Sequence, residues 1–122
     1  NDSELKSGIK GSYAFLAPEV FTDLKYDKAG DVYAFSLIVY QLLTKSSFYR
    51  SSSRYKIMLG VPNGLRPELN DDIPQCYRKL ISKCWEQNPE ERLTFDEIVY
   101  LIKNDVDKKE FLDYVHKIDE LS

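Results

Sequence analysis

The stretch KAGDVYAFSLIVYQLLT, residues 28–44, decides how this chain folds. Its apolar residues stand at positions 32, 33, 35, 37–40, 42 and 43, so they surround a helix instead of forming one stripe. Asp27 is a suitable N-cap directly before it. An apolar surface on all sides is typical of a buried helix, so we expect this segment to be the centre of the core. Asp31 places a charge near the start of this apolar helix, and we expect its carboxylate to need hydrogen-bonding or charged partners.

Three amphipathic helices are predicted after this central segment. Pro74 opens the first, and its apolar residues follow the i, i+3, i+4, i+7, i+8 spacing of one helix face: Tyr77, Leu80, Ile81, Cys84 and Trp85. Thr94 and Glu97 form a capping box before the second, whose stripe is Phe95, Ile98, Val99 and Ile102. The third starts at Asp107 and places Phe111, Val115 and Ile118 on one face.

A shorter helix is expected at YKIMLG, residues 55–60, closed by Gly60. No convincing strand pattern of period 2 is present, and the fold class is therefore predicted as all-α.

Composition narrows the classes of partner. The chain has 122 residues, 43% hydrophobic and 30% charged, which suits one soluble domain. A net charge of -3 argues against nucleic acid as a partner, and no apolar run reaches the ~18 residues of a membrane span. Cys76 and Cys84 fit neither a disulfide framework nor a zinc spacing, so we interpret them as reduced core thiols of a cytoplasmic protein. The chain does not begin with Met, which indicates that an upstream part is missing.

In the stretch GSYAFLAPEVF, residues 11–21, the carboxylate of Glu19 stands among apolar residues. Pro18 suits the first turn of a helix, and Glu19 beside it lies near the positive end of that helix. The dipole alone is too weak to justify burial, so a cation is needed. Arg92, in the bend between two predicted helices, can meet a carboxylate through two parallel hydrogen bonds. We hypothesise a buried Glu19–Arg92 pair; the alternative is two unrelated surface charges.

Residues for catalysis are absent from the sequence. The one histidine, His116, stands on the last predicted helix without a metal-ligand pattern, and we interpret it as a surface or structural residue. No Gly-rich phosphate loop, G-x-S-x-G or H-E-x-x-H occurs. We therefore predict neither a catalytic residue nor a metal site in this chain.

Four blocks of the sequence resemble the protein kinase catalytic domain. Residues 11–19, GSYAFLAPE, are similar to the G-T-x-x-Y-M-A-P-E end of the activation segment. DVYAFS, residues 31–36, resembles the D-V-Y-S-F-G start of the central helix of that domain. GLRPEL (64–69) and CWEQNPEERLTFDEIV (84–99) look like the G-x-R-P and C-W-x-x-x-P-x-x-R-P-S-F-x-E-I blocks of the tyrosine-kinase-like group. The blocks stand in family order, so the resemblance implies the C-terminal part of the helical lobe.

The resemblance implies roles for individual residues. Glu19 and Arg92 match the glutamate and arginine that pair in the family, Asp31 matches an aspartate that braces the catalytic loop, and Trp85 is a core anchor. The residues expected to line the substrate pocket are Gly11, Ser12, Tyr13 and Phe15. Ser12 stands where serine/threonine kinases have Thr. Ser3 and Ser7 fall where activation-loop phosphorylation occurs, although an ordinary loop serine is the alternative at both. Ser36 replaces a family Gly and Leu93 a family Pro, and we expect both changes to be tolerated.

The resemblance also sets the domain limits and the expected activity. Residues 1–103 correspond to the kinase domain and 104–122 to a C-terminal helical extension. The Gly-rich loop, strand Lys, H-R-D and D-F-G elements that bind ATP and Mg²⁺ are absent, so this chain alone should be inactive. The complete protein is expected to phosphorylate Ser/Thr of protein substrates, with the missing N-terminal part of the domain as a partner. The alternative is a pseudokinase or a truncated, non-catalytic helical interaction module.

Overall fold

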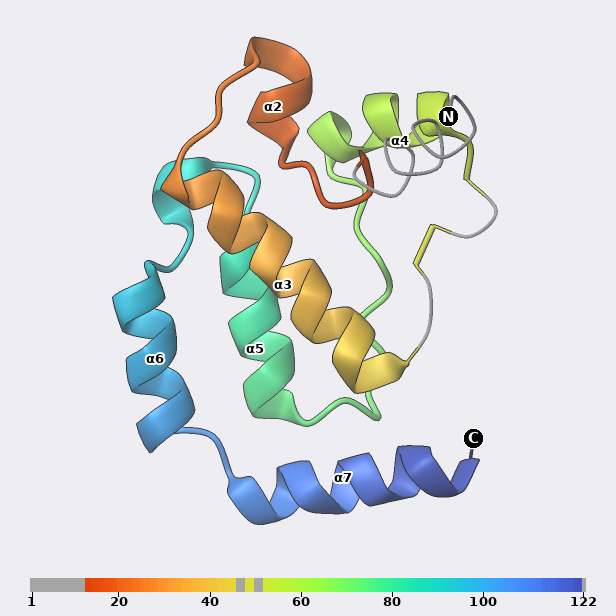
Figure 1. Ribbon diagram of the computed structural model, residues 1–122, viewed down its shortest axis with the longest axis vertical. Helices are drawn as coiled ribbons and strands as arrows, with labels where there is room; N and C mark the ends of the chain where they lie inside the picture. The colour runs from red at the N-terminus through yellow and green to blue at the C-terminus, as the bar shows by residue number, and fades with distance from the viewer. Residues whose placement is uncertain (1–12, 46–47, 50–51, 122) are drawn as a thin grey trace, which may run out of the picture.

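The computed structural model describes residues 13–45, 48–49 and 52–121, and their secondary structure is helical (Figure 1). Two helices, α3 (Lys28–Thr44) and α5 (Gln75–Cys84), run side by side through the centre. The short helices α2 (Pro18–Asp23) and α4 (Arg54–Gly60) lie together at one end. Helix α6 (Phe95–Asn104) lies on the outer side of α5, and α7 (Lys108–Leu121) crosses the opposite end. The short 3₁₀ helices η1 (Val61–Asn63) and η2 (Pro89–Glu91) complete the connections.

The central helix has the bounds that its sequence predicts. Asp27 caps it by accepting a hydrogen bond from the backbone N–H of Ala29 at 3.0 Å. Tyr33 and Leu37 are fully buried, and α3 makes its most extensive contact with α5. The expectation of burial on every side is wrong for one face, because Ile38 and Leu42 are 47% and 72% exposed. The described elements therefore cover only part of the surface of α3.

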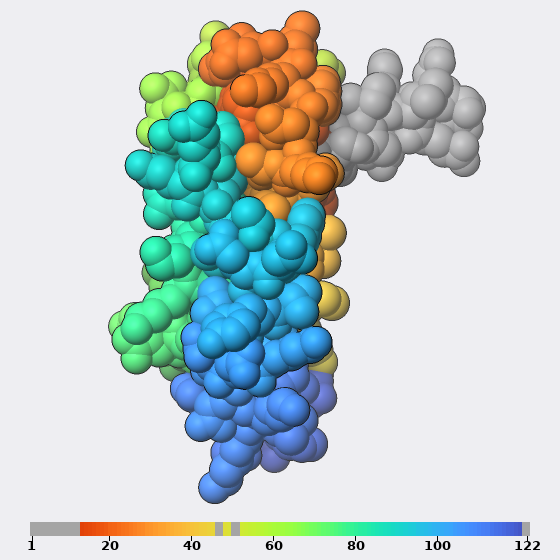
Figure 2. Space-filling view, turned by 90° about the vertical axis from the view of Figure 1, so that its left-hand side faces the viewer, coloured from red at the N-terminus to blue at the C-terminus, as the bar shows by residue number. Residues whose placement is uncertain are grey.

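A second, smaller core lies between α3, α5 and α6. It consists of Val32, Leu80, Cys84 and Ile98. The predicted stripe on α6 is correct for Ile98 but wrong for Phe95, Val99 and Ile102, which are 42%, 48% and 37% exposed. The physical reason is that α6 is the outermost helix and contacts this core through Ile98 and the half-buried Leu101 (Figure 2).

Two departures from the kinase pattern fit this packing through hydrogen bonds. The buried hydroxyl of Ser36 donates to the carbonyl of Tyr33 at 2.6 Å, so its polarity is satisfied within the helix. The backbone N–H of Leu93 donates to the carbonyl of Lys83 at 3.3 Å. A proline at position 93 could not make this bond because it has no N–H. Leu93 also packs against the second core.

Helix α4 ends at Gly60 as predicted, but Gly60 is not the left-handed cap that closes it. Gly60 is right-handed, with φ −74°, and the chain continues into η1 before Gly64 turns left-handed with φ 102°. Gly60 is instead needed for close packing, because a Cβ there would lie 2.7 Å from Cδ2 of Leu65. The left-handed turn at Gly64 ends the helical segment that α4 and η1 form together.

Helix α7 packs against the ends of α3 and α5. Its start matches the prediction, since Asp107 accepts a hydrogen bond from the backbone N–H of Glu110 at 3.0 Å. The predicted face is partly buried, and Tyr114 between its members is 9% exposed. Phe111 contacts the ring of Tyr77 on α5, with 5.3 Å between ring centroids. An ion pair between Lys45 and Asp119 joins the end of α3 to α7. These contacts integrate α7 into the core.

Candidate functional site

Helix α2 holds Glu19 in a buried position. The helix begins at Pro18, whose missing N–H is no loss in a first turn, and Glu19 follows directly. No side chain caps this helix, so the positive end of its dipole is available to the carboxylate. Glu19 is only 7% exposed, and its charge therefore requires a close cation.

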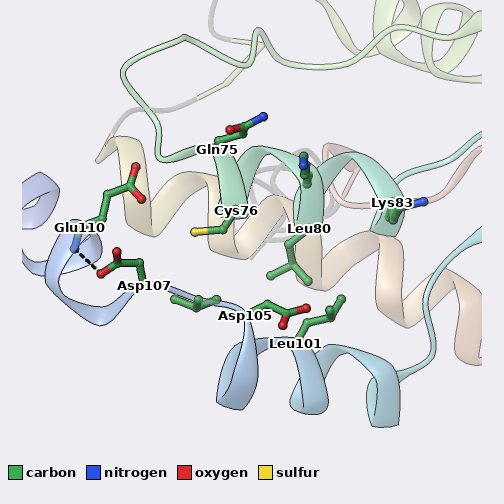
Figure 3. A pocket seen from close by; sticks show the side chains of 10 residues that line it. Gln75, Cys76, Leu80, Lys83, Leu101, Asp105, Asp107 and Glu110 are labelled. Carbon is green, nitrogen blue, oxygen red and sulfur yellow. Dashed lines mark hydrogen bonds between the residues drawn. The ribbon is translucent and has the colours of Figure 1, made fainter.

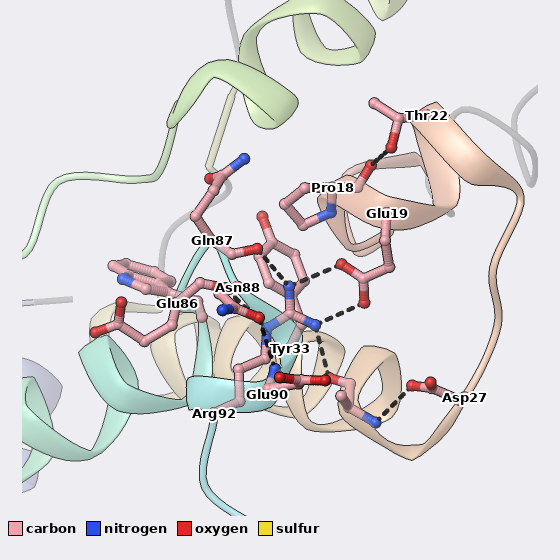
Figure 4. Close-up of polar contacts among 12 residues, drawn as sticks. Pro18, Glu19, Thr22, Asp27, Tyr33, Glu86, Gln87, Asn88, Glu90 and Arg92 are labelled. Atoms are coloured by element: carbon pink, nitrogen blue, oxygen red, sulfur yellow. Dashed lines mark hydrogen bonds and ion pairs between the residues drawn. The ribbon is translucent and has the colours of Figure 1, made fainter.

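Arg92 supplies that cation and uses all five of its N–H donors (Figure 4). It follows η2 directly and is 6% exposed. Nη1 donates to Oε2 of Glu19 at 2.7 Å and Nη2 to Oε1 at 2.8 Å, a two-pronged contact between guanidinium and carboxylate. Nη1 also donates to the carbonyl of Ala29, Nε to that of Glu86 and Nη2 to that of Gln87. One side chain thus ties α2 and the start of α3 to the loop after α5.

Two further residues, Tyr33 and Arg66, complete this site, and neither was predicted from the sequence to belong to it. Tyr33 of α3 lies between two guanidinium groups, with its ring centroid 5.3 Å from Cζ of Arg92 and 5.0 Å from Cζ of Arg66. Burial raises the pKa of the Tyr33 hydroxyl, although both arginines oppose the change. Arg66 hydrogen-bonds three backbone carbonyls and one side chain: those of Val61, Leu65 and Trp85, and Oε1 of Gln87. In the sequence, the only sign that Arg66 is important was its place in the block GLRPEL.

Of the four residues predicted to line the substrate pocket, Tyr13 and Phe15 are among the described residues. The ring of Tyr13 stacks on Phe21 with 6.3 Å between centroids, and Cζ of Arg54 lies 4.3 Å from the Tyr13 centroid. Phe15 packs edge-on against Phe48 at 5.3 Å and adjoins the main core. Gly11 and Ser12 lie outside the described residues, as do Ser3 and Ser7. The substrate and phosphorylation roles stay predictions.

Asp31 does not find the partner that we expected from its place in the sequence. Its side chain is exposed, and within residues 13–45, 48–49 and 52–121 no group forms a hydrogen bond or ion pair with it. The first turn of α3 lies at the surface of the described chain, so the carboxylate of Asp31 is exposed there. Its role as a brace of the catalytic loop stays a prediction.

A cavity of about 400 Å³ lies apart from the Glu19–Arg92 pair, between α5 and the α6–α7 connection (Figure 3). Cys76, Lys79 and Lys83 of α5 line one side of it. Asp105, Asp107 and Glu110 line the other, and Asp107 already caps α7. In the described part of the chain, no three His, Cys, Asp or Glu side chains are grouped so that they could hold a metal ion.

The two thiols should differ in reactivity. Burial raises the pKa of Cys84 to about 12 from 9.0, whereas Cys76 is only half-buried beside the cavity. We expect iodoacetamide at about pH 8 to alkylate Cys76 and to reach Cys84 only after unfolding, as measured by peptide mass spectrometry. Since the folded pKa of Cys84 is the higher one, its stabilising contribution is present below pH 9.0 and is lost as the pH rises towards about 12. Alkylation of both thiols at equal rates in the folded protein would contradict this prediction.

The packing of helices around α3, with the buried Glu19–Arg92 pair, agrees with the C-terminal helical lobe of the protein kinase fold. Comparison with known proteins agrees: residues 1–102 match the family described as protein tyrosine and serine/threonine kinase. The chain belongs to this family, and the match agrees with the resemblance of its sequence blocks to the tyrosine-kinase-like group.

The relatives are much longer proteins. The chain is similar to RGS domain-containing serine/threonine-protein kinase A of Dictyostelium discoideum, 35% identical over 94 residues, which are 77% of this chain and 8% of that protein. It is 34% identical over 96 residues to dual specificity protein kinase shkA of the same organism, covering 77% of this chain and 18% of that protein. Human mitogen-activated protein kinase kinase kinase 7 is 33% identical over 95 residues, 76% of this chain and 16% of that protein.

Among the helices of the described residues, none combines the length and the apolar content that crossing a membrane needs.

Proposed function

We propose that the complete protein transfers the γ-phosphate of ATP to serine or threonine of protein substrates. In this proposal the present chain forms the substrate-side loop and braces the catalytic loop. The observation that carries the proposal is the buried, two-pronged Glu19–Arg92 pair. It fixes the end of the segment that contains Tyr13 and Phe15 relative to α3, and such fixed geometry is what positioning of a substrate requires.

The exposed face of α3 supports a second part of the proposal. Positions 31, 35, 38 and 42 follow the spacing of one helix face, so Asp31 shares this face with the exposed Ile38 and Leu42. An apolar face this exposed on a central helix suits contact with another protein segment. We assign that segment to the N-terminal part of the kinase domain, with Asp31 hydrogen-bonding the backbone of its catalytic loop.

ATP and Mg²⁺ are assigned to that same N-terminal part. Among the described residues no three His, Cys, Asp or Glu side chains are grouped to hold a metal ion, and the sequence lacks a Gly-rich phosphate loop. In this proposal the side chains of this chain take part in no bond-making step of phosphoryl transfer. Their proposed contribution is to hold the substrate loop and the catalytic loop in position.

The proposal is tested with the full-length protein, radiolabelled ATP, Mg²⁺ and casein as a general substrate. We expect phosphate on serine or threonine by phosphoamino-acid analysis. Asp31→Asn should lower kcat far more than it lowers the melting temperature, because it weakens the proposed hydrogen bonds to the catalytic loop, whereas the side chain is exposed in the described chain. The exposed Asp96→Asn on α6 is the matched control and should change neither quantity.

Three results would contradict this proposal. Phosphate found on tyrosine alone excludes the serine/threonine assignment. Failure of the wild-type protein to label casein or itself favours the non-catalytic alternative. If Asp31→Asn retains full kcat, the bracing role is wrong even if the protein is a kinase.

A further inference from the structure

Gln87, in the loop after α5, makes hydrogen bonds with both ends of its side-chain amide. Its Oε1 accepts from Nη2 of Arg66 at 2.9 Å. Its Nε2 donates to the carbonyl of Pro62 at 2.6 Å and to that of Val61 at 3.5 Å. Both carbonyls belong to η1, which follows α4 without a break. Because an amide is a donor and an acceptor at once, this one side chain joins the loop to the end of the α4–η1 segment.

The backbone of the same loop binds Arg92, the partner of Glu19. The carbonyl of Gln87 accepts from Nη2 of Arg92 at 3.5 Å, and the neighbouring carbonyl of Glu86 accepts from Nε at 2.8 Å. In Figure 4 the side chain of Gln87 points away from Arg92, while its carbonyl is turned toward it. The loop is therefore held to α2 through its backbone and Arg92, and to α4 and η1 through the side chain of Gln87.

The two elements that this loop holds both contact Tyr13, a residue predicted to line the substrate pocket. The ring of Tyr13 stacks on Phe21 of α2, with 6.3 Å between the centroids. Cζ of Arg54 on α4 lies 4.3 Å from the same ring centroid. A rotation of α4 relative to α2 would move Arg54 away from the ring. The orientation of these two short helices thus decides the surroundings of Tyr13.

Apolar packing keeps α4 close to the core but does not fix its orientation. Ile57 and Val61 are buried, at 6% and 0% exposure. The hydrophobic effect that buries them is non-directional, whereas a hydrogen bond requires an aligned donor and acceptor. The carbonyl of Val61 accepts from Nη1 of Arg66 at 3.2 Å as well as from Gln87. These polar contacts supply the direction that apolar burial lacks.

We propose that Gln87 is a positioning residue, which sets the orientation of α4 relative to α2 and thereby the surroundings of Tyr13 in the substrate-side loop. The kinase pattern C-W-x-x-x-P leaves position 87 unspecified, so this role comes from the contacts and not from the resemblance. The effect on substrate rests on the proposed function, whereas the link between the loop and α4 concerns this chain alone. The two parts are therefore tested by separate measurements.

The first measurement is hydrogen exchange of the full-length protein, followed by mass spectrometry. Gln87→Met keeps the length of the side chain but removes the amide. We expect exchange of the backbone amides of residues 54–65 to become about tenfold faster, with α6 unchanged. Gln75→Met on α5 is the matched control, since Gln75 is exposed and its side chain has no hydrogen bond among the described residues. It should leave exchange in residues 54–65 as it is in the wild type.

The second measurement is steady-state kinetics with casein as the substrate. Gln87→Met should raise the KM for casein several-fold and leave both kcat and the KM for ATP unchanged, because it alters the substrate side and not the reacting groups. Gln75→Met should change none of these constants. A general loss of stability would lower the fraction of active protein, and so reduce the apparent kcat without this selective rise in KM.

Several outcomes would overturn the inference. Unchanged exchange in residues 54–65 of Gln87→Met would show that the side chain does not hold α4, whatever the activity. Faster exchange in every helix would contradict a local role. Faster exchange in residues 54–65 with an unchanged KM for casein would exclude the effect on substrate. If the wild type labels neither casein nor itself, the proposed function is wrong, while locally faster exchange still supports the link between the loop and α4.

Discussion

Replacing Arg92 with alanine is expected to lower the free energy of unfolding by about 3–5 kcal/mol. The change leaves Glu19 with its charge in a site that is only 7% exposed and removes both hydrogen bonds to its oxygens. It also leaves the carbonyls of Ala29 and Glu86 without this donor. Urea unfolding of the protein, followed by far-ultraviolet circular dichroism, measures the loss. Most of it should come from the stranded charge and not from the bond that is lost.

Two further variants separate burial from charge. Glu19→Gln keeps the shape of the side chain but not its charge, so we expect a clear fall in melting temperature that is smaller than that of Arg92→Ala. Asp71→Asn is the control, because Asp71 is fully exposed and lies 3.7 Å from Arg78; its change should have no measurable effect. An unchanged melting temperature for Glu19→Gln would mean that the carboxylate is not held as a buried ion pair.

The helices could be predicted because their signals are local. Asp27 and the apolar run after it set the start of α3, and Thr94 and Glu97 make the reciprocal hydrogen bonds of the capping box in the structure. The helix end at Gly60 was also predicted, but the reason for a glycine there was missed, because the sequence alone does not reveal that Leu65 packs against it. The exposure of Asp31 was not predicted either, since a position in an apolar segment does not tell which turn of a helix reaches the surface.

The candidate site was predictable only where side chains pair with side chains. Arg92 stood out because an arginine in a bend between apolar helices needs an acid, and one buried acid was available. Arg66 could not be interpreted in this way, since three of its acceptors are backbone carbonyls that every sequence provides. The stacking of Tyr33 between both arginines follows from tertiary packing and leaves no spacing signal.

Replacing Trp85 with alanine is the second change with a large expected effect, a loss of about 3–5 kcal/mol in the free energy of unfolding. Trp85 ends α5, is 8% exposed, and belongs to the main core, where its ring lies 6.3 Å from that of Tyr40 on α3. Its carbonyl accepts a hydrogen bond from Nε of Arg66 at 3.0 Å. The substitution keeps the backbone bond, so the loss measures the cavity left between α3 and α5.

The comparison that decides this prediction is with Tyr100→Ala. Tyr100 is an aromatic residue on α6 that is 64% exposed, and its removal should cost little because it leaves no cavity. Trp85→Phe fills part of the space, so its loss in the free energy of unfolding should lie between those of Trp85→Ala and Tyr100→Ala. Unfolding must be followed by circular dichroism, since Trp85 is the one tryptophan of this chain. If Trp85→Ala loses no more stability than Tyr100→Ala, the contact between α3 and α5 does not depend on this side chain, and the core must be held by the aliphatic residues of the two helices.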